Sequence, residues 1–212
     1  KENLNTSLVR YYDGGSPTAL WAVRSLGINP SDGRELFLTK EGTYTFEYDT
    51  EDEVVVGNSE PKLEGVLGST LYWKGFSFSL YFRYSLGADV FTEATYNKVE
   101  NISLAGLKSN QDKRALHDRW QKPGDHAKFK GISLTETTPI SSRFVLRENY
   151  IKAESISVGY DFESQAVQKL GIQSLRLQAN TTDLFRISSI KEERGIEYPF
   201  ARSFSFSLQV TF

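Results

Sequence analysis

The stretch "FSFSLYFRYSL", Phe76–Leu86, alternates apolar and mostly polar side chains over eleven residues. One face carries aromatic and aliphatic side chains, and the other carries serines together with Tyr81 and Arg83. A period of two predicts a β-strand, because successive side chains of a strand point to opposite faces. The length also matches the roughly 9–11 residues that a tilted strand needs to cross a bilayer. The stretch therefore predicts a strand that could span a membrane.

The residues just before this strand predict its partner. "VLGSTLYW", Val66–Trp73, is a second strand segment, and only Lys74 and Gly75 separate the two. Two-residue connections between strands are typical of tight β-hairpins. We therefore expect an antiparallel hairpin that turns at Lys74-Gly75.

Other segments of the chain follow the same period. The segment Tyr150–Phe162 places charged side chains first and apolar ones last on one face, as in a strand that enters an apolar layer from water. The final segment, Ser203–Phe212, opposes serines with an apolar stripe. Further strands are predicted at Thr18–Gly27, from Glu35 onward and at Ser174–Thr181.

Between Ala88 and Arg143 the alternation fades. A connection of this length is unusual in a compact soluble domain, whereas long extracellular loops are common in outer-membrane barrels. One short surface helix is predicted inside it, with Ser109 as N-cap and Asp112 completing a capping box, before Pro123. We therefore expect residues 88–143 to form a long loop region.

Composition excludes several classes of protein. The net charge of −2 gives no general electrostatic reason to bind nucleic acid, and the absence of cysteine excludes disulfides and thiolate chemistry. No run of 18 apolar residues predicts a transmembrane helix. The mean hydropathy of −0.42 still allows a membrane barrel, because barrel strands alternate lipid-facing and lumen-facing residues. The aromatic content of 13% would supply the girdles of such a barrel.

Motifs of catalysis and cofactor binding are missing from the sequence. The two histidines, His117 and His126, lie in "HDRWQKPGDH" with a spacing that matches no metal site. No nucleophile elbow, phosphate-binding loop or dinucleotide fingerprint is present. We therefore expect no enzyme activity, no metal and no cofactor.

Four residues are candidates for contacts with a solute. Tyr81 and Arg83 would line a polar lumen, where they either contact a solute or only fill space. Arg119 and Trp120 could bind a polar ligand such as a sugar by hydrogen bonding and stacking. The alternative for Trp120, which we favour, is that it anchors its own loop.

Six motifs follow one another along the chain, and the aromatic C-terminal segment completes the series. They are "ALWAVRSLGINPSDGRELFL" (19–38), "GNSEPKLEGVLGSTLYWKGFSFSL" (57–80), "RALHDRWQKPGDHAKF" (114–129), "SSRFVLRENYIKAESISVGYDF" (141–162), "NTTDLF" (180–185) and "EYPFAR" (197–202). In this order they resemble motifs of the SusC/RagA family of TonB-dependent outer-membrane transporters, and the resemblance covers nearly the whole chain. Asp183 stands where the family commonly has asparagine.

The resemblance implies an all-β fold, in which residues 1–212 form the C-terminal antiparallel strands of a large transmembrane barrel. Such plugged barrels have about 22 strands, and the resemblance implies long extracellular loops and one short surface helix here. It places the plug domain and the earlier strands outside these 212 residues. An incomplete barrel in lipid would leave unpaired edges, so we expect that sequence to complete the wall.

The resemblance also implies a function and partners. It predicts import of oligosaccharides or peptides across the outer membrane of a Gram-negative, Bacteroidetes-type bacterium, with a SusD-like lipoprotein at the extracellular mouth. TonB–ExbB–ExbD would supply energy through the plug, and lipid would surround the wall. The aromatic end resembles the signal read by the barrel-assembly machinery, which here would comprise Phe204, Phe206, Leu208, Val210 and Phe212.

A protein of a different class remains as an alternative. The same alternation would suit a secreted, soluble β-sandwich that binds carbohydrate, since one face of each of its strands is also apolar. The two differ in what covers that face, which is a second sheet in a sandwich and lipid in a barrel.

Overall fold

The computed structural model describes residues 8–104, 106–133, 135–162, 169, 171–191 and 202–212. The chain divides into two compact units. The first unit comprises Lys1–Glu60 with Ala88–Arg147, and the second comprises Pro61–Gly87 with Glu148–Phe212.

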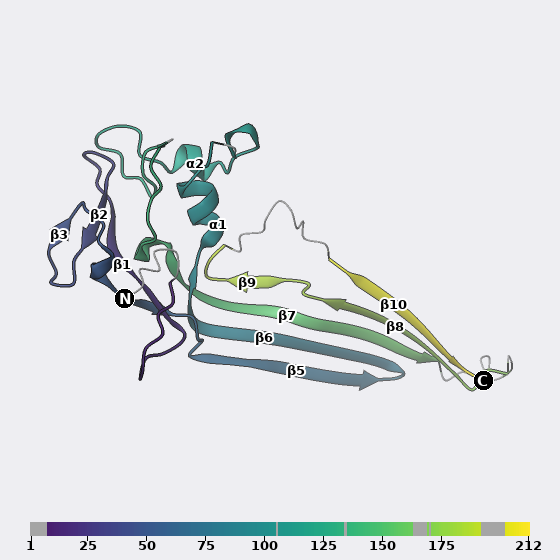
Figure 1. Ribbon diagram of the computed structural model, residues 1–212. Coiled ribbons are helices and arrows are strands. Elements are labelled where there is room, and N and C mark those ends of the chain that lie inside the picture. Colours follow the sequence, from purple (N-terminus) through teal and green to yellow (C-terminus); the bar gives the residue numbers. More distant parts are fainter. Residues whose placement is uncertain (1–7, 105, 134, 163–168, 170, 192–201) are drawn as a thin grey trace. The chain divides into compact units, whose positions relative to one another are not determined.

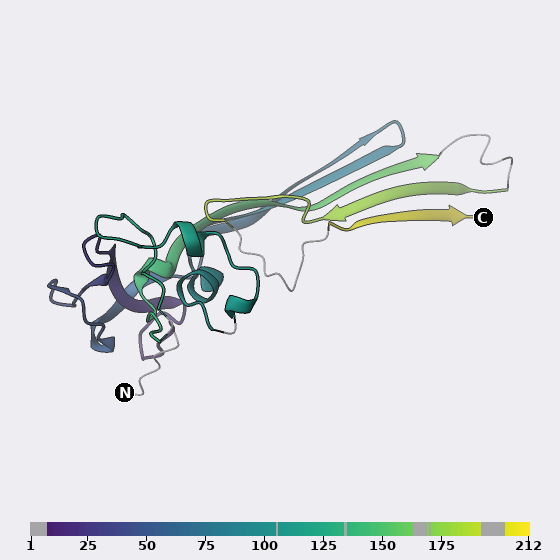
Figure 2. The same cartoon turned by 90° about the horizontal axis from the view of Figure 1, so that it is seen from above.

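The second unit is built on a six-stranded sheet with the strand order β10-β8-β7-β6-β5, and β9 pairs with β7 outside this path. Figures 1 and 2 show the long strands side by side in one layer. Among the described residues of the second unit, this is the only sheet. The strands are β5 (Leu63–Trp73), β6 (Phe76–Phe91), β7 (Val145–Phe162), β8 (Ser174–Thr182), β9 (Arg186–Ser188) and β10 (Phe204–Thr211).

The hairpin predicted at Lys74-Gly75 is confirmed. Strands β5 and β6 pair antiparallel from Leu63↔Leu86 to Trp73↔Phe76, which leaves Lys74 and Gly75 as the connection. Both turn residues have positive φ angles, 46° and 85°. This left-handed conformation matches the twist of the flanking strands in a two-residue turn.

The period of two located the strands of this sheet correctly and underestimated some of their lengths. β8 and β10 coincide with the predicted segments to within one residue at each end. β7 begins five residues before the predicted Tyr150, and β6 continues five residues beyond Leu86. Strand β6 thus extends into the range 88–143, where irregular loop was expected.

The first unit contains a four-stranded sheet with the order β3-β2-β1-β4. The strand predicted over Thr18–Gly27 is β1 (Ala19–Ile28), and the strand predicted from Glu35 is β2 (Glu35–Leu38). The others are β3 (Tyr44–Thr45) and β4 (Glu53–Asn58).

Short helical turns make up much of the rest of the first unit, and none of the helices among the described residues has the length and apolar character needed to cross a membrane. Three of them contribute Val99, Ala115 and Phe144 to a core that also contains Phe129, and the rings of Phe91 and Tyr96 lie against it. The helices are η1 (Thr50–Asp52), α1 (Glu93–Thr95), the π-helical η2 (Tyr96–Glu100), η3 (Gly106–Lys108), α2 (Arg114–His117) and η4 (Ser142–Phe144).

The predicted helix exists but begins later than the capping box indicated. Helix α2 starts at Arg114, and its N-cap is Lys113 rather than Ser109. The reason is local competition by the Asp112 carboxylate, which accepts from the backbone N of Arg114 at 2.9 Å and from its guanidinium at 2.6 Å. A side chain bound in this way favours a turn over a helix, so the prediction of Ser109 as N-cap was wrong.

Candidate functional site

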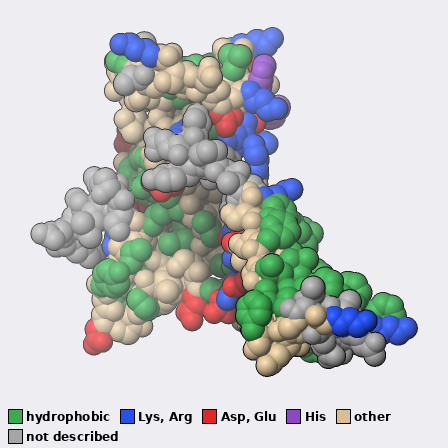
Figure 3. Space-filling view, turned by 90° about the vertical axis from the view of Figure 1, so that its right-hand side faces the viewer, with side chains coloured by type: hydrophobic (Ala, Val, Ile, Leu, Met, Phe, Trp, Pro, Cys, Tyr) green, Lys and Arg blue, Asp and Glu red, His purple; other side chains and the backbone are tan. Residues whose placement is uncertain are grey.

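One face of the second unit's sheet carries exposed apolar side chains that are aligned across three strands. Leu208 of β10 pairs with Leu177 of β8, which in turn pairs with Tyr160 of β7. Phe206 and Leu208 are 76% and 64% exposed, and Figure 3 shows hydrophobic side chains gathered over this sheet. The neighbouring rows join Phe206, Ala179 and Val158, and Val210, Leu175 and Phe162.

The five residues of the predicted barrel-assembly signal follow this apolar face. Four of them, Phe204, Phe206, Leu208 and Phe212, are more than half exposed, and Val210 is partly buried. Their side chains are thus available to an apolar environment. Recognition by an assembly machinery stays a prediction.

The opposite face of the same strands is polar. Arg176 of β8 pairs with Asp161 of β7, with 3.6 Å between Arg176 Nη1 and Asp161 Oδ2. The Arg176 Nη2 also donates to Ser77 Oγ of β6 at 3.1 Å, and Gln178 Nε2 donates to Ser157 Oγ at 2.9 Å. The two faces therefore differ in polarity, as a wall between lipid and a water-filled lumen requires.

Tyr81 and Arg83, the candidate lumen residues, both have partners within the second unit. Tyr81 packs over Gly68, where an added Cβ would lie only 2.3 Å from the ring, and it remains 40% exposed. Arg83 donates to Glu154 from Nε at 2.6 Å and from Nη2 at 2.8 Å. Such a two-point ion pair fixes the guanidinium. Contact of either residue with a solute stays a prediction.

Arg119 and Trp120, the candidate ligand residues, hold the loop region together. The Arg119 side chain donates to the carbonyl oxygens of Val99, Glu100 and Lys130, and the residue is only 6% exposed. Burial lowers the pKa of its guanidinium. The Trp120 ring lies where a Cβ on Gly33 would fall, and its Nε1 donates to a backbone carbonyl at 2.9 Å. This geometry supports the anchoring alternative, and ligand binding by either residue stays a prediction.

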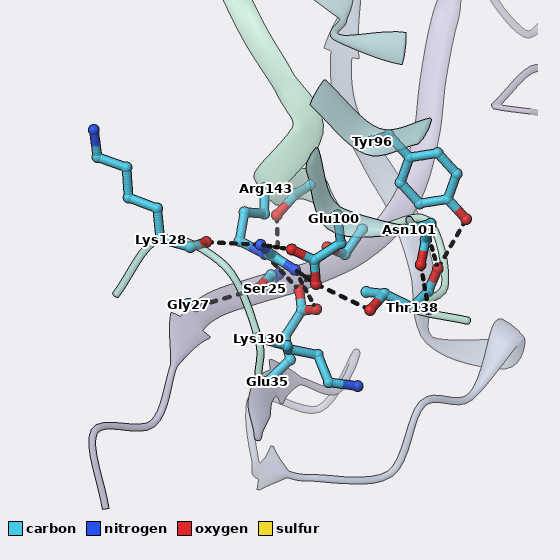
Figure 4. A network of polar contacts seen from close by, with 12 residues as sticks. Ser25, Gly27, Glu35, Tyr96, Glu100, Asn101, Lys128, Lys130, Thr138 and Arg143 are labelled. Carbon is cyan, nitrogen blue, oxygen red and sulfur yellow. Dashed lines mark hydrogen bonds and ion pairs between the residues drawn. The ribbon is translucent and has the colours of Figure 1, made fainter. Parts of the chain in front are cut away.

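A buried ionic network occupies the centre of the first unit (Figure 4). The guanidinium of Arg143 lies between two carboxylates, those of Glu35 on β2 and Glu100 on η2, with contacts of 2.9 to 3.2 Å. The side chains of Glu35 and Glu100 are 2% and 0% exposed. Hydroxyl groups complete the network, because Ser141 donates to Glu35 at 2.6 Å and Thr138 donates to Glu100 at 2.9 Å.

The network keeps Arg143 charged and uses it to position the loop. Burial alone would lower the pKa of the Arg143 guanidinium, but the hydrogen bonds to Glu35 and Glu100 outweigh it and raise that pKa. Arg143 Nη1 also donates to the backbone carbonyl of Lys128 at 2.7 Å. In Figure 4 the Lys128 carbonyl faces the network, while its ammonium group points away from it. The cation thus connects β2, η2 and the loop around Lys128.

The sequence did not reveal that Arg143, Glu35 and Glu100 form one ionic network. Arg143 is 108 residues from Glu35 and 43 from Glu100, and no local period relates them. The only available signal was that Glu35 and Arg143 each lie within a quoted motif segment.

Both histidines lie at an open pocket of about 370 Å3 in the first unit. Among the described residues, no three His, Cys, Asp or Glu side chains are grouped in a way that could hold a metal ion. The pocket is therefore a polar hollow without a metal-ligand set in this part of the chain. It is lined by His117, Asp118, Arg119, Gln121, Lys122, Asp125, His126, Ala127 and Lys128.

Comparison with curated proteins finds similarity to TonB-dependent receptors. The chain is 24% identical to TonB-dependent receptor P39 of Formosa agariphila over 161 residues, which is 74% of this chain and 15% of that receptor. It is 25% identical to TonB-dependent receptor P3 of the same organism over 173 residues, covering 82% and 16% of the two chains. The chain thus spans about one sixth of the length of these relatives. No protein-family model matches it.

Comparison with solved structures finds matches to RagAB, which is described as a peptide importer and a peptide transporter. The structure of the RagAB peptide importer in its open-open state matches with a TM-score of 0.74 at 15% identity, covering 96% of this chain and 25% of that one. A second structure, of the RagAB peptide transporter, matches with a TM-score of 0.69 at 16% identity, over 83% and 20% of the chains. At these identities the likeness concerns the fold.

The sequence relatives and the structural matches point to the same kind of protein. A segment of a transmembrane barrel wall needs an antiparallel sheet with one apolar and one polar face, and the sheet of the second unit has both. Within the described residues the sheet is not closed on itself, as expected of a part of a barrel. The chain is a homologue of TonB-dependent receptors, and its fold is that of part of the barrel of a SusC/RagA-family transporter.

Proposed function

We propose that residues 1–212 form wall strands and extracellular loops of a TonB-dependent active transporter in the outer membrane of a Gram-negative bacterium. The observation that carries this proposal is the aligned apolar face of β7, β8 and β10, whose side chains remain exposed opposite a polar face. A soluble monomer seldom exposes a large contiguous apolar surface. In a barrel wall, lipid covers that surface and the polar face meets the lumen.

We propose oligosaccharides or peptides as the substrates. The relatives are described as TonB-dependent receptors, and the matching structures as a peptide importer. In this proposal residues 88–143 belong to the extracellular loops that meet the substrate. A plug domain, the remaining barrel strands, a SusD-like lipoprotein and TonB–ExbB–ExbD would complete the machine. The relatives are receptors and transporters rather than enzymes, and we propose no catalytic step.

The soluble sandwich accounts less well for the structure. A sandwich buries the apolar faces of two sheets against one another. In the second unit Leu67 and Leu71 of β5 are 62% and 63% exposed, and Phe206 and Leu208 of β10 are 76% and 64% exposed. Within the described residues of the second unit there is no second sheet that could bury these side chains. This exposure favours a wall in lipid.

The test uses the intact protein that contains this chain, expressed in its native membrane. We expect extraction from the outer membrane only with detergent, migration on a gel that changes on heating, and uptake that stops when TonB is deleted. Uptake would be measured with labelled oligosaccharide and peptide mixtures, in cells with and without the gene. A protein that is released in soluble form without detergent would refute the proposal and support the sandwich.

A further inference from the structure

The pocket of the first unit, lined by His117–Asp118–Arg119, Gln121–Lys122 and Asp125–Lys128, has features that the proposed wall function does not use. Its volume of about 370 Å3 lies within the range of small-ligand sites. Eight of its nine lining residues are polar or charged, with Ala127 as the exception. No Phe, Tyr or Trp ring lines it, so neutral sugars lack the broad stacking surface that these side chains provide. The pocket therefore suits a charged or strongly polar group.

The wall of the pocket is held in place by its own hydrogen bonds. The Asp118 carbonyl accepts from the backbone N of Lys128 at 3.0 Å, which closes the loop at its base. The Asp125 carboxylate accepts from the backbone N of Gln121 and of Lys122 at 3.1 and 3.0 Å. Such a pre-formed loop loses little conformational entropy when it binds a ligand.

Two buried arginines support this wall from behind. Arg143 holds the carbonyl of Lys128, and Arg119 holds the carbonyl of Lys130 at 2.9 Å. The Nη atoms of both guanidinium groups are thus engaged in structural contacts, and the Nε of Arg119, which has no partner among the described residues, is buried. The groups that remain for a ligand are those at the front of the pocket.

The groups at the front are mainly basic. Within the part of the chain that the structure describes, the ammonium groups of Lys122 and Lys128 and the imidazoles of His117 and His126 form no hydrogen bond or ion pair with protein. Figure 3 shows histidine side chains next to Lys and Arg side chains on this face. Of the two acidic lining residues, Asp125 already accepts two backbone hydrogen bonds. The donors available to a ligand therefore exceed the acceptors.

We propose that this pocket binds an oxyanion group, carboxylate or sulfate, carried by the transported substrate. Lys122 and Lys128 supply the charge, and the two imidazoles supply further donors, as ammonium groups do at many anion sites. The inference rests on the proposed transport function and narrows its substrate class to acidic oligosaccharides or peptides.

The test is binding to the detergent-purified intact transporter, measured by isothermal titration calorimetry at low and high salt. The probes are tetragalacturonate and tetraglutamate, which carry carboxylates on a sugar and on a peptide backbone, and a sulfated carrageenan tetrasaccharide. Maltotetraose and tetraalanine are the neutral probes. At least one anionic probe should bind more tightly than its neutral counterpart, and higher salt should weaken that binding.

The decisive variant is Lys122→Gln with Lys128→Gln. Both side chains are exposed, so the fold should persist, which heat-modifiable gel migration would verify. Each exposed charge contact is worth a few-fold, so we expect the affinity for the anionic probe to fall about threefold to twentyfold, with neutral probes unaffected. Lys108→Gln, an exposed lysine of the first unit outside the pocket lining, is the matched control and should change nothing.

The outcomes separate this inference from the transport proposal. If no anionic probe binds better than its neutral counterpart, or if the double variant binds it as tightly as the unmodified protein, the inference is overturned. TonB-dependent uptake that continues in either case leaves the transport function intact. A preference for one anionic probe supports the inference and identifies whether carboxylate or sulfate, and sugar or peptide, is recognised.

Discussion

Replacing Arg143 by Met is the sharpest test of the buried network, because it removes the cation between two carboxylates. The side chains of Glu35 and Glu100 are 2% and 0% exposed, so neither could be solvated in its place. Removing one partner of a buried ion pair costs about 3–5 kcal/mol. The hydroxyl groups of Ser141 and Thr138 still donate to the two carboxylates, which favours the lower end, about 3 kcal/mol.

Hydrogen–deuterium exchange on the intact, detergent-purified protein would measure this loss. If the first unit opens as a cooperative unit, a loss of about 3 kcal/mol speeds exchange of its protected amides by about two orders of magnitude. Arg147→Met is the matched control. Arg147 lies four residues further on and pairs with Asp89 at 3.2 Å, but its side chain is 57% exposed, so the change should be small.

A rescue experiment distinguishes the charge from the packing of the arginine side chain. In a triple variant that combines Arg143→Met with Glu35→Gln and Glu100→Gln, no buried charge is left without a partner, and most of the protection should return. The reasoning would be refuted if Arg143→Met changed exchange by less than about fivefold. It would also be refuted if the triple variant exchanged as fast as the single one.

Three further predictions concern single positions. Leu208→Arg on the apolar face of β10 should cost about 2–4 kcal/mol in the membrane and lower the heat-modifiable folded fraction, whereas Ser207→Arg on the polar face should have little effect. Gly68→Ala should lower the thermal midpoint of the barrel in detergent, and Tyr81→Ser should restore part of it, because the added Cβ would lie 2.3 Å from the Tyr81 ring. Burial raises the pKa of Tyr48 to about 12 from 10.0, so the folded state retains a proton that the unfolded state releases in that window. The first unit should therefore lose stability as pH rises from 10 to 12, and Tyr48→Phe should lose less, as measured by hydrogen exchange.

The wall strands were predictable because their information is local. In the hairpin of β5 and β6, the polarity of each residue indicates which face of the sheet it lies on, and the two-residue turn determines which residues pair. The same holds for β10, where the apolar stripe coincides with the exposed apolar face. For these elements the period of two is a direct consequence of the backbone geometry.

The loop region was much less predictable because its contacts are not local. The charges of Glu35 and Arg143 could equally have been solvated, and only the fold brings them together. Arg119 illustrates the same limit, since the sequence did not show that its guanidinium binds three carbonyls of its own unit. The late start of α2 likewise depends on which donor the Asp112 carboxylate binds, and here that donor is the backbone N of Arg114.

The paired rows of β7, β8 and β10 also bear on how the wall is assembled. A slip of one residue between β8 and β10 would turn Phe206 and Leu208 toward the side of Gln178 and Arg176. Four of the eight paired rows would then place an aromatic or aliphatic side chain in the polar layer, and the other four would place a polar side chain in the apolar layer, so that the penalties would accumulate along the strand. The side chains of the exposed apolar face thus also specify the register of β10, because a strand displaced by one residue would be less stable.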